Sequence, residues 1–198
     1  MDIYGEHRRL VGMTLYRARR IVTGHDSGGR SIVISDGSAQ NLVPNPSDPE
    51  RGHINFWRTD AVPASNASDH DPAAGAPFAL PPPKGGTLFR FFQIAPEKNE
   101  AGLSKEERDA RMARMFQAVG AGHARQAMGR HPSMHRTDSV DYIVLLKGEV
   151  TALMDVGEVT MKPFDVLIQR GTRHGWVNRG DEPALLMAVL VDAEPLPG

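Results

Sequence analysis

The sequence predicts a mostly β protein whose C-terminal part is an antiparallel barrel or sandwich. Between residues 135 and 192, short runs of strand-forming residues are separated by turn residues, for example at Lys147-Gly148 and Arg170-Gly171. This rhythm is typical of antiparallel barrels and sandwiches. The 198 residues are 40% hydrophobic and 24% charged, so we expect one domain of ordinary size with a real core.

The N-terminal part has the pattern of an arm of strands with a long loop. β-Branched residues at 21–23 and 30–35 are joined by a Gly-rich turn, which indicates a hairpin. Residues 44–86 are rich in Pro, Ala, Ser, Asp and Gly, and we expect mostly surface loop there, with a strand-like stretch at 54–59. A clear strand pattern follows at residues 87–94. We expect these strands to extend the sheets of the barrel or to pair with a second copy.

One amphipathic helix is expected at residues 105–119. Ser104 and Glu107 have the spacing of a capping box, which marks a helix start. Apolar side chains then recur with helical spacing on one face, at Met112, Met115, Phe116 and Val119. This stripe indicates ordinary packing against the rest of the protein.

These patterns divide the chain into three parts. Residues 1–100 form the strand-bearing arm with its Pro-rich loop, 101–128 the helix and a connection, and 129–198 the barrel core. Exposed strand edges and a long arm favour a homodimer, because a second subunit can cover an unpaired edge.

Charge and composition exclude several classes of function. A formal net charge of -1 provides no basic field for nucleic acid or a membrane surface, so we expect a small-molecule partner. The absence of cysteine excludes disulfides, thiolate metal ligands and cysteine nucleophiles. No export signal or membrane span is recognisable, which predicts a cytoplasmic protein.

Polar side chains with ligand chemistry fall on shared faces of two expected strands. Alternation along the first strand places four of them on one face: His135, Thr137, Ser139 and Asp141. The second strand places three on one face: His174, Trp176 and Asn178. If the two strands meet, His135, Asp141 and His174 converge, and two imidazoles with a carboxylate suit Fe, Mn or Zn.

Two motifs in this region resemble those of the cupin superfamily. The first cupin motif, G-x5-H-x-H-x3/4-E-x6-G, is similar to the stretch from Gly129 through His135 to Gly148. The second, G-x5/7-P-x-G-x2-H-x3-N, is similar to the stretch that ends with His174 and Asn178. The resemblance covers about a third of the chain. It implies a jelly-roll-like double-stranded β-helix barrel whose mouth holds a metal and a small ligand.

The chain departs from the cupin pattern at four positions, one of which is Gln169 at the place of the proline of the second motif. Thr137 stands at the place of the second histidine of the first motif, and Asp141 at the place of the glutamate. Phe164 stands where a turn glycine is common. A threonine hydroxyl is a poor replacement for imidazole, and aspartate is one methylene shorter than glutamate.

Two functions of different class follow from this site. The first is an enzyme whose divalent metal, held by His135, Asp141 and His174 as the catalytic residues, acts on a small organic acid or a carbonyl or aromatic compound. Decarboxylation, isomerisation, cyclisation and dioxygenation all remain open. The second is a metal-free sensor or carrier, in which the inward polar groups satisfy one another. No nucleotide or organic cofactor is expected in either case.

The remaining candidates have weaker signals. Substrate contacts are assigned to Thr137, Ser139, Trp176 and Asn178, although an aromatic ring such as Trp176 also suits plain core. Without metal, Asp141 could orient His135 as a general base. His131 could reach the barrel mouth, and Arg90 could bind a substrate carboxylate if its strand lines the mouth, with solvent exposure as the alternative. Four further histidines are expected on the surface: His25, His53, His70 and His123.

Overall fold

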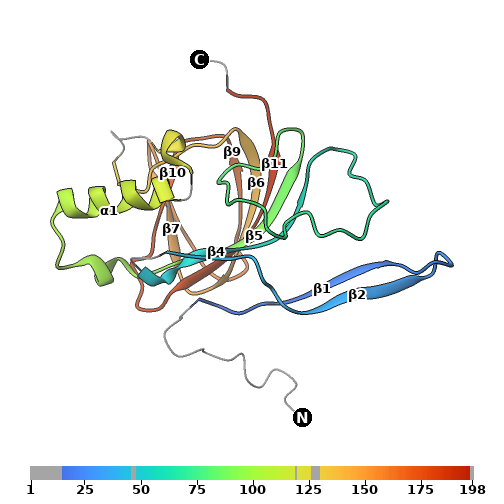
Figure 1. Ribbon diagram of the computed structural model, residues 1–198. Coiled ribbons are helices and arrows are strands. Elements are labelled where there is room, and N and C mark those ends of the chain that lie inside the picture. The colour runs from blue at the N-terminus through green and yellow to red at the C-terminus, as the bar shows by residue number, and fades with distance from the viewer. Residues whose placement is uncertain (1–14, 46–47, 119, 126–129, 197–198) are drawn as a thin grey trace, which may run out of the picture.

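The computed structural model describes residues 15–45, 48–118, 120–125 and 130–196. Two sheets of antiparallel strands face each other, with one α-helix across one end (Figure 1). The all-β fold class predicted from the sequence is confirmed, and the sheets form a jelly-roll-like open barrel.

The larger sheet has six strands in the order β3-β4-β5-β11-β6-β9. Their bounds are β3 Leu42–Asn45, β4 Asp48–Thr59, β5 Thr87–Ile94, β11 Ala184–Asp192, β6 Ser139–Lys147 and β9 Val166–Arg170. The smaller sheet has the order β10-β7-β8, with β10 His174–Val177, β7 Val150–Met154 and β8 Glu158–Met161. The strand expected at 54–59 is part of the longer β4, which begins at Asp48. β4 is longer than expected because it pairs with β3 on one side and with β5 on the other.

Apolar side chains from both sheets meet in one core. Leu88, Phe92, Leu145 and Leu186 come from the larger sheet, and Val150 comes from the smaller one. Because β5 pairs with β11 along its whole length, the sheet that carries the core includes strands from both halves of the chain. The N-terminal strands β4 and β5 therefore extend the barrel sheet, which is one of the two arrangements expected from the sequence.

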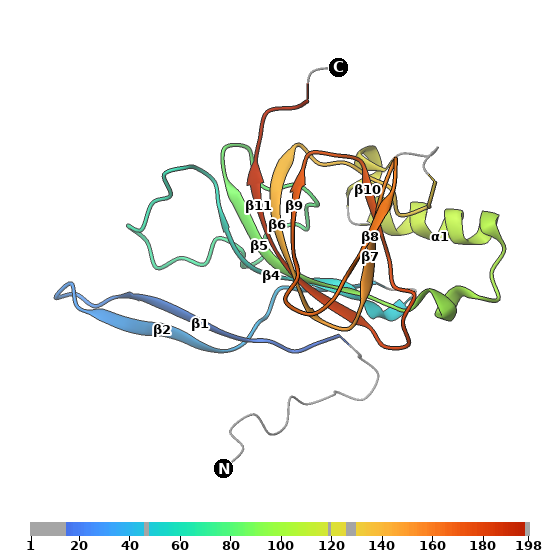
Figure 2. The same ribbon diagram turned by 180° about the vertical axis from the view of Figure 1, so that it is seen from behind.

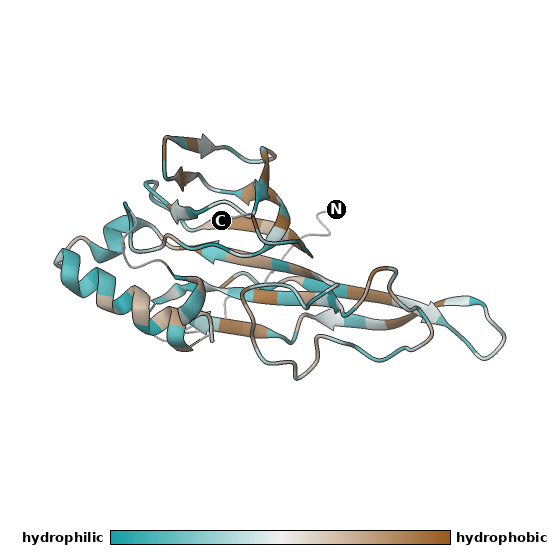
Figure 3. Cartoon of the chain, turned by 90° about the horizontal axis from the view of Figure 1, so that it is seen from above, coloured by the Kyte–Doolittle hydropathy of each residue, from teal (hydrophilic) through white to brown (hydrophobic). Residues whose placement is uncertain are grey.

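The expected N-terminal hairpin is present as β1 (Arg19–His25) and β2 (Ser31–Ser38). It projects from the body of the molecule, at the end opposite the helix (Figure 2). Figure 3 shows the same separation from above, with the mostly hydrophilic helix at one end and the hairpin at the other.

Helix α1 spans Lys105–Ala118 and begins as its capping box predicts. The Ser104 amide donates to Glu107 Oε2 at 2.7 Å, and the Glu107 amide donates to Ser104 Oγ at 3.1 Å. Met112 and Phe116 of the apolar stripe are buried, whereas Val119 lies outside the described residues. Two short 3₁₀ segments flank α1, η1 at Glu97–Glu100 and η2 at Gly122–Ala124. Among the described residues, no helix has both the length and the apolar character needed to cross a membrane.

Two turn positions have a left-handed backbone. Gly148 has φ 81°, and a β-carbon there would lie 3.0 Å from the α-carbon of Ala184. Both the backbone conformation and the close approach of Ala184 therefore favour glycine in this turn. Phe164 has φ 73°, the conformation that glycine adopts more easily, and its side chain is 80% exposed. Phe164 stands where cupins commonly have a turn glycine, so its backbone is strained in this turn.

Candidate functional site

A cavity of about 120 Å³ opens between the two sheets and helix α1. Its wall is mostly apolar and is contributed by both sheets and the helix, for example by Phe92, Ile143, Met112, Phe116 and Trp176. Ten of the 24 described lining residues are polar or charged, and they include Arg51 as well as His135, Asp141 and His174. An apolar pocket with a few convergent polar groups is the usual form of a small-molecule site.

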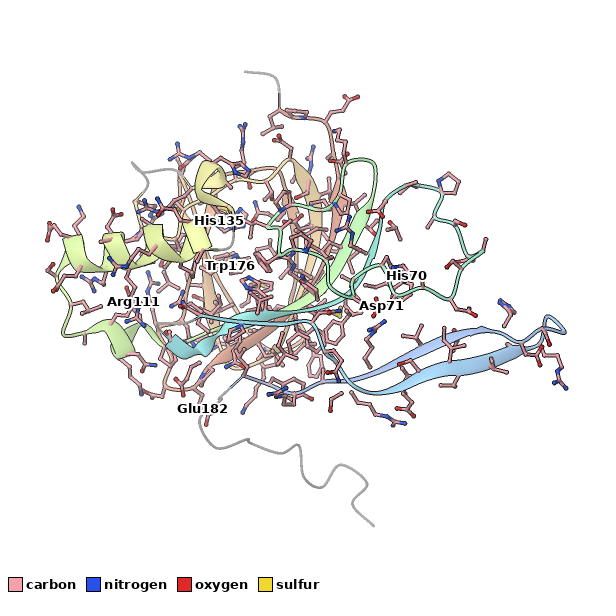
Figure 4. The ribbon with its side chains drawn as sticks, viewed as in Figure 1. His70, Asp71, Arg111, His135, Trp176 and Glu182 are labelled. Carbon is pink, nitrogen blue, oxygen red and sulfur yellow. The ribbon has the colours of Figure 1, made fainter. Side chains whose placement is uncertain are left out.

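His135 and His174 lie directly opposite each other across a pair of extended segments. The His135 amide donates to the His174 carbonyl at 2.8 Å, and the His174 amide donates to the His135 carbonyl at 3.0 Å. Side chains of such a pair point to the same side, and the ring centroids are 4.3 Å apart. The structure thus brings together the two imidazoles that the sequence expected to meet. Figure 4 shows His135 and Trp176 between α1 and the strands, with His70 far away on the long loop.

Backbone hydrogen bonds set the protonation of both rings. His135 Nδ1 lies 2.8 Å from the Ser133 carbonyl, and His174 Nδ1 lies 3.0 Å from the Thr172 carbonyl. Because a carbonyl only accepts, each Nδ1 carries the proton, and each neutral ring keeps its lone pair on Nε2. Burial lowers the pKa of His135, and burial together with the neighbouring His135 lowers the pKa of His174 to about 3. Both rings are therefore neutral at physiological pH.

A row of hydroxyl groups leads to the Asp141 carboxylate. Ser139 Oγ lies 2.6 Å from Asp141 Oδ1 and 2.9 Å from Thr137 Oγ1. One hydroxyl has one proton, so Ser139 donates to only one of these oxygens at a time. Burial raises the pKa of Asp141 to about 6, although the Ser139 hydrogen bond and the charge of Arg90 oppose the rise. Asp141 is thus able to hold or release a proton near neutral pH.

The chemistry of the donors fits a metal in part. Two neutral imidazoles with bare Nε2 atoms, each oriented by a carbonyl on Nδ1, are the usual preparation for metal binding. In the described part of the chain, however, no three His, Asp or Glu side chains form a group able to hold a metal ion. Asp141, expected as the third ligand, is held instead by Ser139. Two imidazoles with bare Nε2 atoms are therefore present, whereas the expected group of three ligands does not form among the described residues.

Ser139 and Asn178 do not line the cavity, although the sequence placed them among the substrate contacts. Ser139 is 1% exposed, and its hydroxyl bonds to Thr137 and Asp141. Asn178 is also 1% exposed, and its amide nitrogen donates to the carbonyls of Ile94 and Glu182. Its Oδ1 accepts from the amide of Gly180 at 2.9 Å. The Asn178 side chain therefore links the end of β5 to the loop that contains Gly180 and Glu182.

Thr137 and Trp176 do line the cavity. The Trp176 ring contacts the Phe92 ring edge-on at a centroid distance of 5.8 Å, and it belongs to the main apolar core. Trp176 is therefore both core and cavity wall, which joins the two roles that the sequence left open. His131 is not part of the lining, and its Nδ1 lies 2.7 Å from Ser133 Oγ.

The cavity wall contains His53 and Arg90, whose side chains the sequence favoured at the surface. His53 was expected on the surface, but it lines the cavity, with its ring 4.9 Å from the ring of Phe78. Arg90 lines the cavity and is only 2% exposed, so its strand does face the mouth. The expected surface position holds for His25, His70 and His123, all of which are exposed. The strand expected at 54–59 begins earlier, at Asp48, and includes His53. A strand position was therefore the one sequence signal that could have placed His53 in the interior.

Burial lowers the pKa of His53 well below its usual range, and the charge of Arg90 acts in the same direction. His53 is thus a third neutral imidazole in the cavity wall, although it does not complete a metal-binding group with the other two.

Comparisons with known proteins find a family model, curated relatives and solved structures that are similar to this chain. Residues 123–190 match the family model described as "Cupin domain". "Phomopsin biosynthesis cluster protein C'" of Diaporthe leptostromiformis is 26% identical over 186 residues, which are 89% of this chain and 79% of the relative. "Cupin-domain-containing oxidoreductase fogC" of Aspergillus ruber is 28% identical over 194 residues, which are 96% of this chain and 79% of the relative. A solved "Cupin 2 conserved barrel domain protein" from Salinispora arenicola is 16% identical, with a TM-score of 0.39, and covers 74% of this chain and 79% of its own.

Proposed function

We propose that the chain, whose residues 123–190 match a cupin family model, is a cupin enzyme that transforms a small, largely apolar organic molecule with the help of a divalent metal. The observation that carries this proposal is the His135–His174 pair, which presents two bare Nε2 atoms at an apolar cavity. Of the four reactions considered from the sequence, dioxygenation is the oxidation, and a relative that is named an oxidoreductase favours it. Another relative is named for a biosynthesis cluster, which agrees with a small organic substrate.

His135 and His174 would supply two nitrogen ligands, and water or the substrate would take the remaining positions. When bound there, Fe, Mn or Zn would act as a Lewis acid or, for a redox-active metal, as an oxygen activator. Imidazole is a suitable ligand for all three metals.

The surrounding residues have roles of their own in this proposal. Trp176 and Phe92 offer flat apolar surfaces that orient an unsaturated substrate, and Met112 and Phe116 of helix α1 limit the access of water. Asp141 accepts and releases a proton at its carboxylate, with Ser139 as the group that orients it. Its pKa of about 6 suits proton transfer near neutral pH.

A metal-free binding protein is the second candidate, and one observation favours it. Thr137 replaces a motif histidine, and no group of three ligating side chains forms among the described residues. In this case the same cavity would hold an apolar ligand for sensing or delivery, and the hydroxyl row would satisfy Asp141 internally.

Elemental analysis of the full chain, purified without added metal and again after loading with Fe(II), Mn(II) or Zn(II), distinguishes the two candidates. We expect about one metal ion per chain in the native protein and a loss of at least about tenfold in metal affinity for His174→Ala. His70→Ala, which removes an exposed histidine from the long loop, is the matched control and should keep its metal. A protein that binds none of the three metals after loading contradicts the enzyme proposal and favours the carrier. The homodimer and the cytoplasmic location stay predictions.

A further inference from the structure

Arg90 is a buried cation in the cavity wall. Its side chain comes from the middle of β5, is only 2% exposed, and lines the cavity. Nη2 donates to the Ala79 carbonyl at 2.6 Å, and the guanidinium lies over the Phe78 ring, 4.9 Å from the ring centroid. These two contacts hold the guanidinium in one orientation.

One polar atom of this side chain is left without a partner. Arg90 Nε is buried and has no hydrogen-bond acceptor among the described residues. A buried donor without an acceptor costs free energy, and natural proteins leave few of them. Because the Arg90 side chain lines the cavity, a ligand bound there is the natural source of the missing acceptor.

The positive charge of Arg90 is also incompletely balanced. Asp141 interacts with it electrostatically, but no ion pair joins the two within the described part of the chain, and Ser139 holds the carboxylate instead. Burial lowers the pKa of Arg90 to about 9, so the guanidinium stays charged at neutral pH. The other polar groups of the wall include three neutral imidazoles, which do not offset the charge.

We propose that Arg90 anchors the carboxylate of an aromatic or unsaturated acid in this cavity, and so selects organic anions over neutral molecules of the same shape. The planar guanidinium with a free Nε matches a carboxylate oxygen, which is the strongest kind of hydrogen bond available here. The apolar wall around it, with Trp176 and Phe92, accepts the flat body of the acid. The inference rests on the cavity being the substrate site of the proposed function, and it names the substrate class.

The size of the cavity limits the ligand to about one ring. A cavity of about 120 Å³ is close to the volume of engineered protein cavities that take benzene, roughly 150 Å³. Benzoate and benzamide are therefore a suitable pair of probes, because they have nearly the same shape and differ in charge.

Isothermal titration calorimetry of the full chain with each probe tests the proposal. The protein is first treated with EDTA, so that benzoate cannot bind through a metal. We expect benzoate to bind about tenfold or more tightly than benzamide, because only benzoate pairs with the buried guanidinium. Equal binding of the two probes, tighter binding of benzamide, or binding of neither overturns the proposal.

Substitutions of Arg90 test whether this residue causes the preference for benzoate over benzamide. In Arg90→Gln the benzoate preference should fall to about twofold or less while benzamide binding persists, because the charge is lost and the size is nearly kept. Arg179→Gln, which removes an exposed arginine paired with Glu158 outside the cavity lining, should keep the full preference. If Arg90→Gln does not fold, Arg90→Lys keeps the charge but loses Nε, and it should still reduce the preference by about threefold or more. An undiminished preference in the folded variant overturns the assignment.

This test is separate from that of the enzyme proposal. A protein that binds no metal but prefers benzoate through Arg90 loses the metal-dependent function and keeps the anion site. A protein that binds metal through His174 but shows no benzoate preference keeps the function and loses the anion site.

Discussion

Gly175 packs against Ser133 so closely that a β-carbon at position 175 would lie 2.7 Å from Ser133 Oγ. The same hydroxyl accepts from the Trp176 amide at 3.2 Å, so it cannot move away without losing that bond. Gly175 follows His174 directly, and Ser133 lies two residues before His135. The absence of a side chain at position 175 therefore allows the two histidine segments to approach each other.

Gly175→Ala should destabilise the protein by about 1–3 kcal/mol, because the added methyl group overpacks this contact. Urea denaturation followed by circular dichroism measures the change. Gly37→Ala is the control, since a β-carbon at position 37 meets no atom within 4 Å, and it should change the free energy of unfolding by less than about 0.5 kcal/mol. Equal effects of the two substitutions would show that the contact with Ser133 is not limiting.

Asn178→Ala should lower the free energy of unfolding by about 2–4 kcal/mol. The substitution leaves the buried carbonyl of Ile94, the carbonyl of Glu182 and the amide of Gly180 without their side-chain partner. Asn99→Ala, which removes an exposed hydrogen bond to Glu50, is the comparison and should cost about 0.5 kcal/mol or less. Chemical denaturation of both variants measures the difference, and a cost for Asn178→Ala no larger than that of the control contradicts the structural role.

Phe164→Gly should stabilise the protein by about 0.5–1 kcal/mol. Glycine relieves the left-handed backbone at φ 73°, and the exposed phenylalanine ring loses little packing when it is removed. Phe164→Ala removes the ring but keeps a β-carbon, so it should give no such gain. Thermal unfolding of the two variants separates backbone strain from ring packing, and an equal gain in both would attribute the effect to the ring.

His53→Gln should weaken the loss of stability in acid. Burial, with the charges of Arg90 and Arg51 and the neighbouring His135, makes the folded-state pKa of His53 lower than its unfolded value of 6.5. The unfolded state therefore binds the proton more readily, and the contribution of His53 to stability is complete above pH 6.5 and is lost as the pH falls below it.

Urea denaturation at pH 7.5 and pH 5 measures this effect. The drop in the free energy of unfolding between the two values should be up to about 2 kcal/mol smaller in His53→Gln than in the unchanged protein. His70→Gln replaces an exposed histidine and serves as the matched control. An unchanged drop in His53→Gln would mean that this imidazole is accessible to water when the protein is folded.

Local sequence patterns predicted much of the fold, because they depend on neighbours along the chain. The strand expected at residues 87–94 has the observed bounds of β5, and the capping box at Ser104 forms as its spacing predicts. Alternation also placed His135 and Asp141 toward the same interior, where both line the cavity. These predictions needed only the period of a strand or a helix.

The same alternation could not tell which face of β4 and β5 is buried. Arg90 and His53 are polar residues that sequence statistics assign to the surface, yet both line the cavity. Their position depends on the pairing of β5 with β11 and on the loop that brings Phe78 over both side chains. Conversely, Asn178 has the parity of His174 but is withdrawn from the cavity by three backbone partners.

The amino-acid sequence by itself determined the β class, the helix start and the two histidines of the site. Periodicity, capping and motif spacing depend only on residues that are close together in the sequence. Only the tertiary structure decided that Asp141 bonds to Ser139, and that Arg90 stays buried with an unpartnered Nε. Those outcomes depend on the distances and dielectric surroundings created when strands far apart in the chain pack together.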